Sequence, residues 1–162
     1  MLYLIRHAWA GQHGDPRWPD DNLRPLTKDG KKRFKAVVER LLAAGFAPEL
    51  IATSPLVRAR ETADVIVRVL PEEPELIELE ELAPGSQLDR LIAWTNQQSR
   101  GRDVAWVGHA PDISMWAGGL LGAAPSAIAF GKGAVAALEF GDRIERANGE
   151  LCWLATAKLL GE

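Results

Sequence analysis

The sequence predicts an α/β fold of three layers, with a mostly parallel central sheet and helices on both of its faces. Two observations predict it. Short apolar runs alternate along the chain with segments of helical periodicity, which is typical of parallel strands joined by helices. Several of the runs are continuously apolar, which indicates strands covered on both faces. The expected strands span residues 2–5, 50–53, 75–79, 103–108, 134–140 and 151–156.

The first two expected helices have recognisable starts. Thr27 can cap a helix because apolar residues follow it at the spacing i, i+3, i+4, i+7 and i+8, and Gly45 provides its end. Ser54 followed by Pro55 is typical of an N-cap with proline at the first helical position. Arg58 then falls in or near the first turn of the second helix.

The second half of the chain supplies two more helices and a pair of strands. Ser86 with Asp89 resembles a capping box, and Pro111 opens the last helix. The last two strands are joined by a turn-rich segment, residues 140–150, so we expect them to form an antiparallel pair at one end of the sheet.

Length and composition predict one domain, residues 1–162, with ordinary globular character. The net charge of −3, with no stripe of Lys or Arg, argues against nucleic acid or an anionic membrane as partner. The single cysteine, Cys152, cannot form an internal disulfide, which fits a reducing compartment. The apolar start is too short for a signal peptide and is interrupted by Arg6, so we expect a cytoplasmic protein.

Residues 11–26 form a long polar loop containing Pro16, Pro19 and Pro25. Loops of this length inside domains are usually functional or disordered. Arg24 has two roles open to it: reaching a site, or anchoring the loop.

Positively charged or titratable residues follow three of the expected strands. Arg6 and His7 come after the first strand, Arg58 after the second and His109 after the fourth. Ligands of open α/β sheets bind at the carboxyl ends of the strands, so we expect these side chains to face one crevice. No carboxylate is evident among them, and such a cluster repels itself unless an anion completes it.

Each of these residues also has a structural interpretation. A cation is disfavoured near a helix N-terminus, so Arg58 fits a phosphate or sulfate site, yet it could equally pair with Glu61 on the surface, as Arg60 is expected to pair with Asp64. Either histidine alone could be a satisfied, partly buried residue. Two histidines at one sheet edge favour function.

A metal site is the competing hypothesis for the histidines. His7, His13, His109 and Asp15 could supply ligands, but their spacing matches no common metal motif and neighbouring arginines repel cations. We therefore expect no metal and no cofactor. The segment FGKGA around Lys132 lacks the first glycine of a P-loop.

Two further groups of residues have an alternative role. Most tryptophans are expected in the core, although Trp9 and Trp18 could line the mouth of the site. Residues 28–35 carry a basic run that we interpret as the solvated face of the first helix.

With these residues in view, the sequence resembles the histidine phosphatase superfamily, also called the phosphoglycerate-mutase-like family. The matching motifs are LIRHA, SPLVRARETA and VGHAP, in that order. The resemblance implies that His7 is a nucleophile that becomes phosphorylated, that Arg6, Arg58 and His109 hold the phosphoryl oxygens, and that Ala110 lies at the substrate.

The sequence departs from the family pattern in two places. Ala8 stands where many members have glycine, and the lid of larger relatives, with its glutamate general acid, is missing. The segments LEELAPGS and LRPLTKDG resemble small bacterial phosphohistidine phosphatases. Glu81 is the candidate acid and Glu80 the next, unless both are surface carboxylates.

The resemblance implies a metal-independent phosphatase for phosphohistidine on a signalling or phosphotransfer protein. Two alternatives stay open: a phosphatase for a small phosphorylated metabolite, and a non-catalytic anion-binding module. The sequence specifies no oligomeric state.

Overall fold

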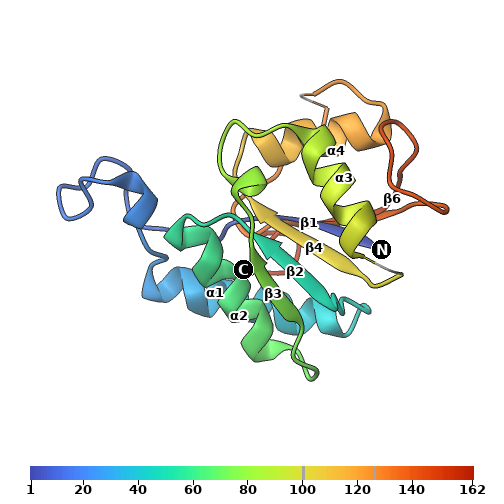
Figure 1. Cartoon of the computed structure of the whole chain (residues 1–162). Coiled ribbons are helices and arrows are strands. Elements are labelled where there is room, and N and C mark those ends of the chain that lie inside the picture. Colours follow the sequence, from blue (N-terminus) through green and yellow to red (C-terminus); the bar gives the residue numbers. More distant parts are fainter. Residues whose placement is uncertain (100, 126) are drawn as a thin grey trace.

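The computed structural model describes residues 1–99, 101–125 and 127–162, and in these residues a six-stranded sheet lies between two helical layers (Figure 1). The strand order is β3-β2-β4-β1-β5-β6. Strands β1 to β4 pair in parallel, whereas β5 runs antiparallel to both β1 and β6. The predicted fold class, including the closing antiparallel pair, is confirmed. The strands are β1 (Leu2–Arg6), β2 (Leu50–Thr53), β3 (Glu75–Glu78), β4 (Val104–Gly108), β5 (Val135–Glu139) and β6 (Glu150–Ala155).

Helices cover the two faces of the sheet in pairs. Figure 1 shows α1 (Lys28–Leu42) and α2 (Val57–Val69) on one face, and α3 (Leu88–Gln98) and α4 (Asp112–Leu121) on the other. Successive side chains of a strand point to opposite faces. Tyr3 and Ile5 of β1 accordingly join the apolar cluster under α1 and α2, while Leu2 and Leu4 join the cluster under α3 and α4.

The start of α1 matches the sequence prediction. The hydroxyl oxygen of Thr27 accepts the backbone N–H of Gly30 at 2.9 Å, which makes Thr27 the N-cap. The helix begins against the chain that leaves β1, because the Thr27 N–H donates to the carbonyl of Trp9 at 2.9 Å. A β-carbon on Gly30 would lie 2.2 Å from that carbonyl oxygen, so this close approach requires glycine.

The predicted starts of α2 and α3 are wrong. Helix α2 begins at Val57 with Leu56 as its N-cap, because residues 54–56 form a turn in which the Ser54 hydroxyl accepts the Leu56 N–H at 3.3 Å. Helix α3 follows Gln87 and has no side-chain cap.

The residues of the expected capping box before α3 have other partners. The hydroxyl of Ser86 donates to the carbonyl of Ala83 at 2.7 Å. The Asp89 carboxylate accepts from Arg146 at 2.6 Å. Both side chains are therefore engaged away from the helix N-terminus.

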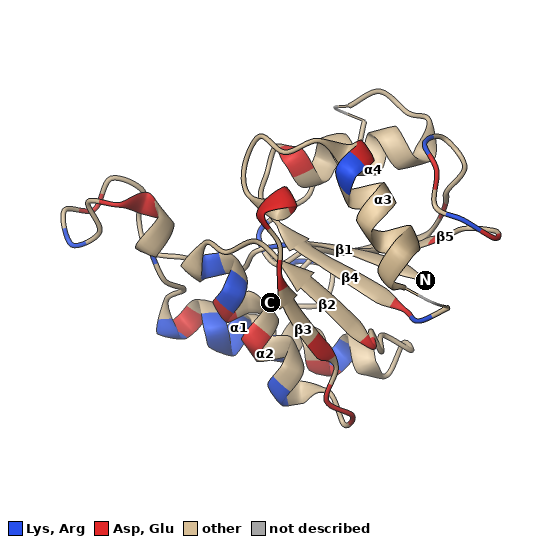
Figure 2. Cartoon of the chain, viewed as in Figure 1, with Lys and Arg blue, Asp and Glu red and all other residues tan. Residues whose placement is uncertain are grey.

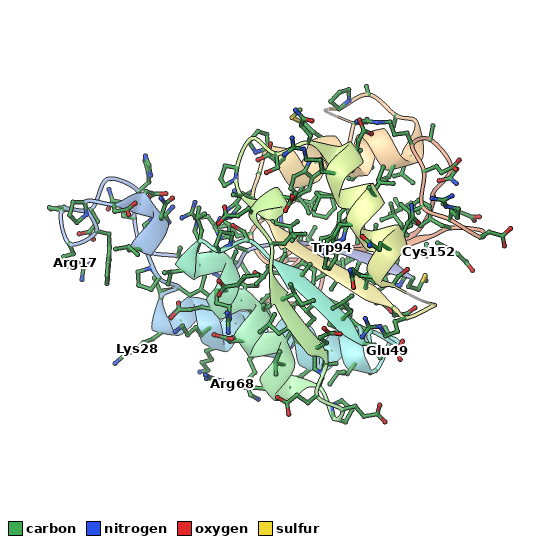
Figure 3. All side chains as sticks on the ribbon, viewed as in Figure 1. Arg17, Lys28, Glu49, Arg68, Trp94 and Cys152 are labelled. Carbon is green, nitrogen blue, oxygen red and sulfur yellow. The ribbon has the colours of Figure 1, made fainter. Side chains whose placement is uncertain are left out.

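The chain between β1 and α1 leaves the body of the molecule. Figure 1 shows this segment extending away from the sheet, and Arg17 lies near its far end in Figure 3. A bridge between Ala10 and Leu26 closes its base, and the short helix η1 (Asp21–Leu23) lies on its return path. The long predicted loop is thus ordered around a closed base.

Among the helices, charged residues lie mainly on α1 and α2, and few lie on α3 and α4 (Figure 2). In the basic run at the start of α1, Lys28, Lys32 and Lys35 are exposed as predicted, whereas Lys31 pairs with Glu61 at 2.6 Å. Within the described part of the chain, no helix combines the length and the apolar character needed to cross a membrane.

Candidate active site

A pocket of about 550 Å³ lies at the edge of the sheet where the parallel strands end. It brings together the four residues that the sequence predicted to converge, Arg6, His7, Arg58 and His109. Strands β1 and β4 are neighbours in register, with Arg6 opposite Gly108, so the residues that follow these strands meet. The full lining is Arg6, His7, Ala10, Gly11, Gln12, His13, Asp21, Arg24, Arg58, Pro84, His109, Ala110 and Lys132.

His7 is buried, with only 7% of its surface exposed. Its Nδ1 lies 2.8 Å from the carbonyl oxygen of Ala8. A carbonyl can only accept, so Nδ1 carries the proton and Nε2 keeps its lone pair. Burial, assisted by the positive charges of Arg58, Arg6 and Arg24, lowers the pKa of His7 to about 3. His7 is therefore a neutral imidazole near pH 7 with a free nitrogen lone pair.

His109 lies beside His7, with 5.1 Å between the ring centroids. Its Nε2 is 2.9 Å from the hydroxyl oxygen of Ser54, and its Nδ1 is buried without a hydrogen-bond partner among the described residues. Burial, followed by the proximity of the second titratable ring, His7, and by the charge of Arg58, lowers the pKa of His109 to about 3. The turn that displaces the start of α2 thus gives His109 its hydroxyl neighbour.

The guanidinium groups of Arg6 and Arg58 lie in the same pocket as the two histidines. Nη1 of Arg6 donates to the carbonyl of Phe130 at 2.7 Å, and Nη1 of Arg58 donates to the carbonyl of Asp21 at 2.8 Å. The Nε atoms of both arginines are buried and have no partner among the residues that the structure describes. A buried polar group without a partner costs about 1–3 kcal/mol, and more when charged. An anion in the pocket would offer acceptors to these nitrogens.

Backbone contacts fix the relative position of His7 and Arg58. The N–H of Ala8 donates to the Thr62 hydroxyl at 3.0 Å, and that hydroxyl donates to the carbonyl of Arg58 at 2.7 Å. The His7 N–H donates to the carbonyl of Gly108 at 2.9 Å. The strand end that carries His7 is therefore fastened to α2 on one side and to β4 on the other.

The long loop contributes a carboxylate that the sequence analysis did not place here. Oδ1 of Asp21 accepts from Nε of Arg24 at 2.7 Å and from Nδ1 of His13 at 2.8 Å, while its Oδ2 lies 3.2 Å from Nη1 of Arg58. The hydrogen bond from Arg24 is the largest influence that holds the pKa of Asp21 well below its usual range. The expected absence of a carboxylate is corrected: Asp21 joins three basic side chains of the pocket.

Arg24 has both roles that the sequence left open. It lines the pocket, and its Nη1 donates to the carbonyl of Gly11 across the base of the loop at 2.8 Å. The alternative partner proposed for Arg58 is wrong, because the Glu61 carboxylate accepts from Lys31 and from the Leu26 N–H instead. The expected pair of Arg60 with Asp64 is confirmed at 3.2 Å.

Several predicted residues do not line the pocket. Glu80 and Glu81 line a separate hollow together with residues 85–87 and Arg90. The turn η2 (Glu80–Leu82) buries Leu82, and from this part of the chain Pro84 lines the pocket around His7. Trp9 does not line the mouth of the pocket. The guanidinium of Arg33 lies over its ring, 4.0 Å from the ring centroid.

Trp18 is likewise absent from the lining, whereas Ala110 is part of it. Lys132, in the segment between α4 and β5, also lines the pocket, a role that the sequence did not predict. Its position between two glycines was the only sequence signal.

The histidines do not gather with carboxylates as a metal site requires. Among residues 1–99, 101–125 and 127–162, no group of three or more His, Cys, Asp and Glu side chains lies close enough to hold a metal ion. His13, one of the considered ligands, pairs with Asp21, while Asp15 pairs with Arg17 at 2.7 Å.

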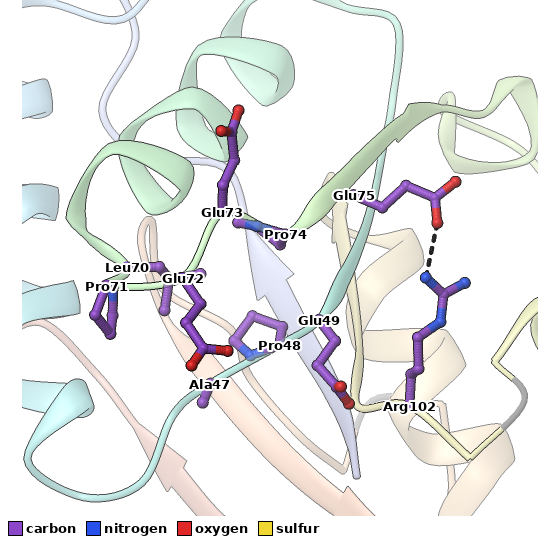
Figure 4. Close-up of a pocket in the computed structure, with 10 residues that line it drawn as sticks. All are labelled: Ala47, Pro48, Glu49, Leu70, Pro71, Glu72, Glu73, Pro74, Glu75 and Arg102. Atoms are coloured by element: carbon purple, nitrogen blue, oxygen red, sulfur yellow. Dashed lines mark hydrogen bonds and ion pairs between the residues drawn. The ribbon is translucent and has the colours of Figure 1, made fainter.

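A second hollow of similar size, about 530 Å³, has the opposite chemistry (Figure 4). It lies where β2 and β3 begin, and four glutamates line it with three prolines. Among the described residues that line it, the one cation, Arg102, is paired with Glu75 at 2.7 Å. This acidic hollow does not suit an anion, so the pocket around His7 is the candidate active site.

The fold and the pocket together define a class: an α/β protein with arginines and histidines gathered at the carboxyl edge of a parallel sheet. The sequence model of the histidine phosphatase superfamily (branch 1) matches residues 2–86. The chain belongs to the histidine phosphatase superfamily. An uncharacterized protein of Picosynechococcus is 37% identical over 134 residues, which cover 81% of this chain and 74% of that protein.

Solved structures share the fold over nearly the whole chain. The protein histidine phosphatase SixA complexed with tungstate has a TM-score of 0.85 at 22% identity, covering 98% of each chain. A candidate phosphohistidine phosphatase SixA from Nakamurella multipartitia has a TM-score of 0.75 at 25% identity, covering 96% of this chain and 94% of its own. An alpha-ribazole phosphatase of Shigella flexneri and a phosphoserine phosphatase of Entamoeba histolytica also share the fold, with TM-scores of 0.71 and 0.69.

Proposed function

We propose that this protein is a metal-independent phosphatase that acts through a phosphohistidine intermediate on His7. The observation that carries the proposal is the contact between Nδ1 of His7 and the carbonyl of Ala8 at 2.8 Å. It leaves Nε2 unprotonated in a pocket whose lining includes three arginines and two further histidines. Phosphoryl transfer requires positioning and charge stabilisation, and a neutral nitrogen nucleophile held beside fixed cations supplies both.

In the first step, the lone pair of His7 Nε2 attacks phosphorus. The new N–P bond forms as the bond from phosphorus to the leaving group breaks, and the leaving group keeps that electron pair and takes up a proton. In the second step, water attacks phosphorus, the N–P bond breaks, and inorganic phosphate leaves. His7 returns to its neutral form and the protons of water remain with phosphate and solvent.

Arg6 and Arg58 are the residues we assign to the phosphoryl oxygens. Both Nε atoms lack a partner among the described residues, and both residues line the same pocket, which supports this assignment. His109 is assigned the third contact. If the Ser54 hydroxyl donates to Nε2, the neutral His109 ring carries its proton on Nδ1 and can donate it to an oxygen. Preorganised donors of this kind lower the barrier by stabilising charge in the transition state.

The substrate we propose is phosphohistidine on a signalling or phosphotransfer protein. Imidazole, with a conjugate-acid pKa of about 6.5, leaves far more readily than an alkoxide, whose basicity is close to that of hydroxide (water pKa about 15.7). The reaction therefore tolerates a weak general acid or none. Glu81 lines the neighbouring hollow rather than this pocket, so the mechanism above does not depend on it.

Similarity of fold also supports this substrate, since the SixA structures named above are a protein histidine phosphatase and a candidate phosphohistidine phosphatase. A small phosphorylated metabolite is the second candidate. The alpha-ribazole and phosphoserine phosphatases, which share the fold, favour it. A non-catalytic anion-binding module is the third.

Turnover of an aryl phosphate separates an enzyme from a binding module. We expect hydrolysis by the unaltered protein that survives EDTA and is inhibited by vanadate, and loss of hydrolysis in His7→Ala. An undiminished rate in a folded His7→Ala protein would remove the nucleophile assignment. Loss of activity on EDTA treatment would favour a metal instead.

A substrate panel separates the two enzymatic candidates. It compares a phosphohistidine protein with sugar phosphates, phosphoserine and phosphoglycerate at equal concentration. We expect the highest kcat/KM for the phosphohistidine protein. A higher kcat/KM for one small phosphate ester would transfer the assignment to the metabolite class.

A further inference from the structure

The segment of residues 130–134, which leads from α4 into β5, is hydrogen-bonded to Arg6 and His7. The N–H of Gly133 lies 3.2 Å from the carbonyl oxygens of both Arg6 and His7, and the N–H of Arg6 donates to the carbonyl of Ala134 at 3.1 Å. At the other end of the segment, the Arg6 side chain donates a hydrogen bond to the carbonyl of Phe130 at 2.7 Å. The backbone at Lys132 is therefore held beside the nucleophile.

The turn in this segment needs glycine after the lysine. Gly133 has a φ of +68°, and a β-carbon there would lie 3.1 Å from ring carbons of both Phe34 and Trp9. This packing fixes where the chain turns, directly after Lys132. Lys132 itself is exposed and lines the pocket, whereas Arg58 and His109 are buried within it. Its ammonium group is thus available to a group at the mouth of the pocket.

The charges of the pocket do not balance with a phosphoryl group alone. Among the residues that the structure describes, four permanent cations line the pocket, Arg6, Arg24, Arg58 and Lys132, together with one carboxylate, Asp21. A phosphoryl group adds about 1.5 to 2 negative charges at pH 7. About one positive charge is left over.

Lys132 is the cation whose positive charge the phosphoryl group and Asp21 leave without a counterion. Asp21 contacts Arg24 and Arg58, and the unpartnered Nε atoms belong to Arg6 and Arg58, which we assign to the phosphoryl oxygens. Lys132 makes no ion pair with any residue that the structure describes. A substrate that meets this pocket with a second negative charge would neutralise it.

We propose that Lys132 binds a carboxylate of the substrate protein, carried by an Asp or Glu that flanks the phosphohistidine. This inference rests on the proposed function and names the chemistry of its partner. A residue next to the phosphorylated side chain stays outside the buried part of the pocket, where the exposed lysine lies. Lys132 is then a specificity-determining residue that selects an acidic context.

Two histidine peptides of equal length, phosphorylated chemically on histidine, provide the test. One has Glu on both sides of the phosphohistidine and the other has Lys. We expect the unaltered protein to favour the Glu peptide about three- to tenfold in kcat/KM, Lys132→Met to lose the preference, and Lys132→Glu to reverse it. Lys158→Glu, the same charge change on an exposed lysine of the C-terminal turn, should keep the original preference.

Three results would overturn the inference, and they are distinguishable. Equal turnover of both peptides by the unaltered protein would contradict binding of an acidic flanking residue but would be consistent with the proposed function. The same shift in Lys132→Glu and Lys158→Glu shows that only net charge matters. If Lys132→Met keeps the peptide preference but loses kcat/KM for a small phosphorylated carboxylic acid, the carboxylate that Lys132 binds belongs to a small molecule. Turnover of neither peptide contradicts the proposed function itself.

Discussion

Arg58 and Asp21 are 37 positions apart in the sequence, yet Nη1 of Arg58 lies 2.8 Å from the carbonyl oxygen of Asp21 and 3.2 Å from its Oδ2. This contact joins the long loop to the first turn of α2. Because Asp21 also accepts from Arg24, one carboxylate holds two arginines of the pocket in place. The loop is therefore part of the candidate site rather than an appendage to it.

Asp21→Asn should lower kcat/KM for an aryl phosphate by about tenfold. Hydrogen bonds to charged groups contribute about 1.5–3 kcal/mol, and a fraction of that is lost when the carboxylate becomes a neutral amide. Asp20→Asn is the matched control, because Asp20 makes the same charge change in the same loop while its Oδ1 accepts only from the backbone of Asn22. A rise in kcat/KM and in vanadate affinity for Asp21→Asn would show that Asp21 competes with phosphate instead of positioning the arginines.

Arg58→Lys should reduce kcat/KM about a hundredfold or more. Lysine keeps the charge but lacks the planar fork that meets two oxygens at once, and removal of one transition-state donor typically costs about 10²–10³ in rate. Arg60→Lys on the same helix should stay within about twofold, since Arg60 is only half-buried, does not line the pocket and pairs with Asp64. Steady-state kinetics on both variants checks this, and equal effects of the two changes would contradict the assignment of Arg58.

Gly30→Ala should destabilise the fold by about 3 kcal/mol or more, among the larger effects of single substitutions. The added β-carbon would lie 2.2 Å from the Trp9 carbonyl oxygen and 2.9 Å from the Thr27 hydroxyl, so the start of α1 must shift. Gly141→Ala is the control, because no heavy atom lies within 4 Å of its β-carbon position. Urea unfolding measures both, and equal midpoints would show that the chain accommodates the methyl group.

The protein should lose stability as the pH falls below 7. Folding lowers the pKa of His7 and of His109 to about 3, against about 6.5 in an unfolded chain. The unfolded state therefore binds more protons between these two values, and stability is fully present above about pH 6.5 and declines below it. The expected loss from pH 7 to 5 is about 2 kcal/mol for each histidine, from about 1.4 kcal/mol per pH unit.

Urea unfolding at pH 7, 6 and 5 measures this loss. His109→Gln removes one of the two titrating groups, so the same pH change should cost that variant about half as much. A free energy of unfolding that stays constant over this range in the unaltered protein would show that the histidines are not buried in neutral form.

The sequence predicted the sheet well because its evidence is local. Continuous apolar runs such as that of β4, which is buried along its whole length, report burial on both faces directly. The convergence of Arg6, His7, Arg58 and His109 followed from the same pattern, because residues after parallel strands must meet at one edge.

Contacts made by loops could not be predicted in this way. The role of Asp21 depends on how the chain returns from the far end of the loop, which no periodicity encodes. The start of α2 was misplaced for a related reason: Ser54 has the chemistry of an N-cap, but its hydroxyl lies beside Nε2 of His109, a residue 55 positions away. Lys132 lines the pocket because the N–H of Gly133, the next residue, contacts the carbonyls of Arg6 and His7, and the sequence does not display such contacts.

The most direct test of the central claim is to trap the intermediate. The unaltered protein is mixed with labelled phosphohistidine protein, quenched in alkali within milliseconds to seconds because phosphohistidine is labile in acid, and mapped by mass spectrometry. We expect one phosphoryl group on Nε2 of His7, and none on His7→Gln. A phosphoryl group on another residue, or turnover at the full rate in folded His7→Gln, would contradict the account.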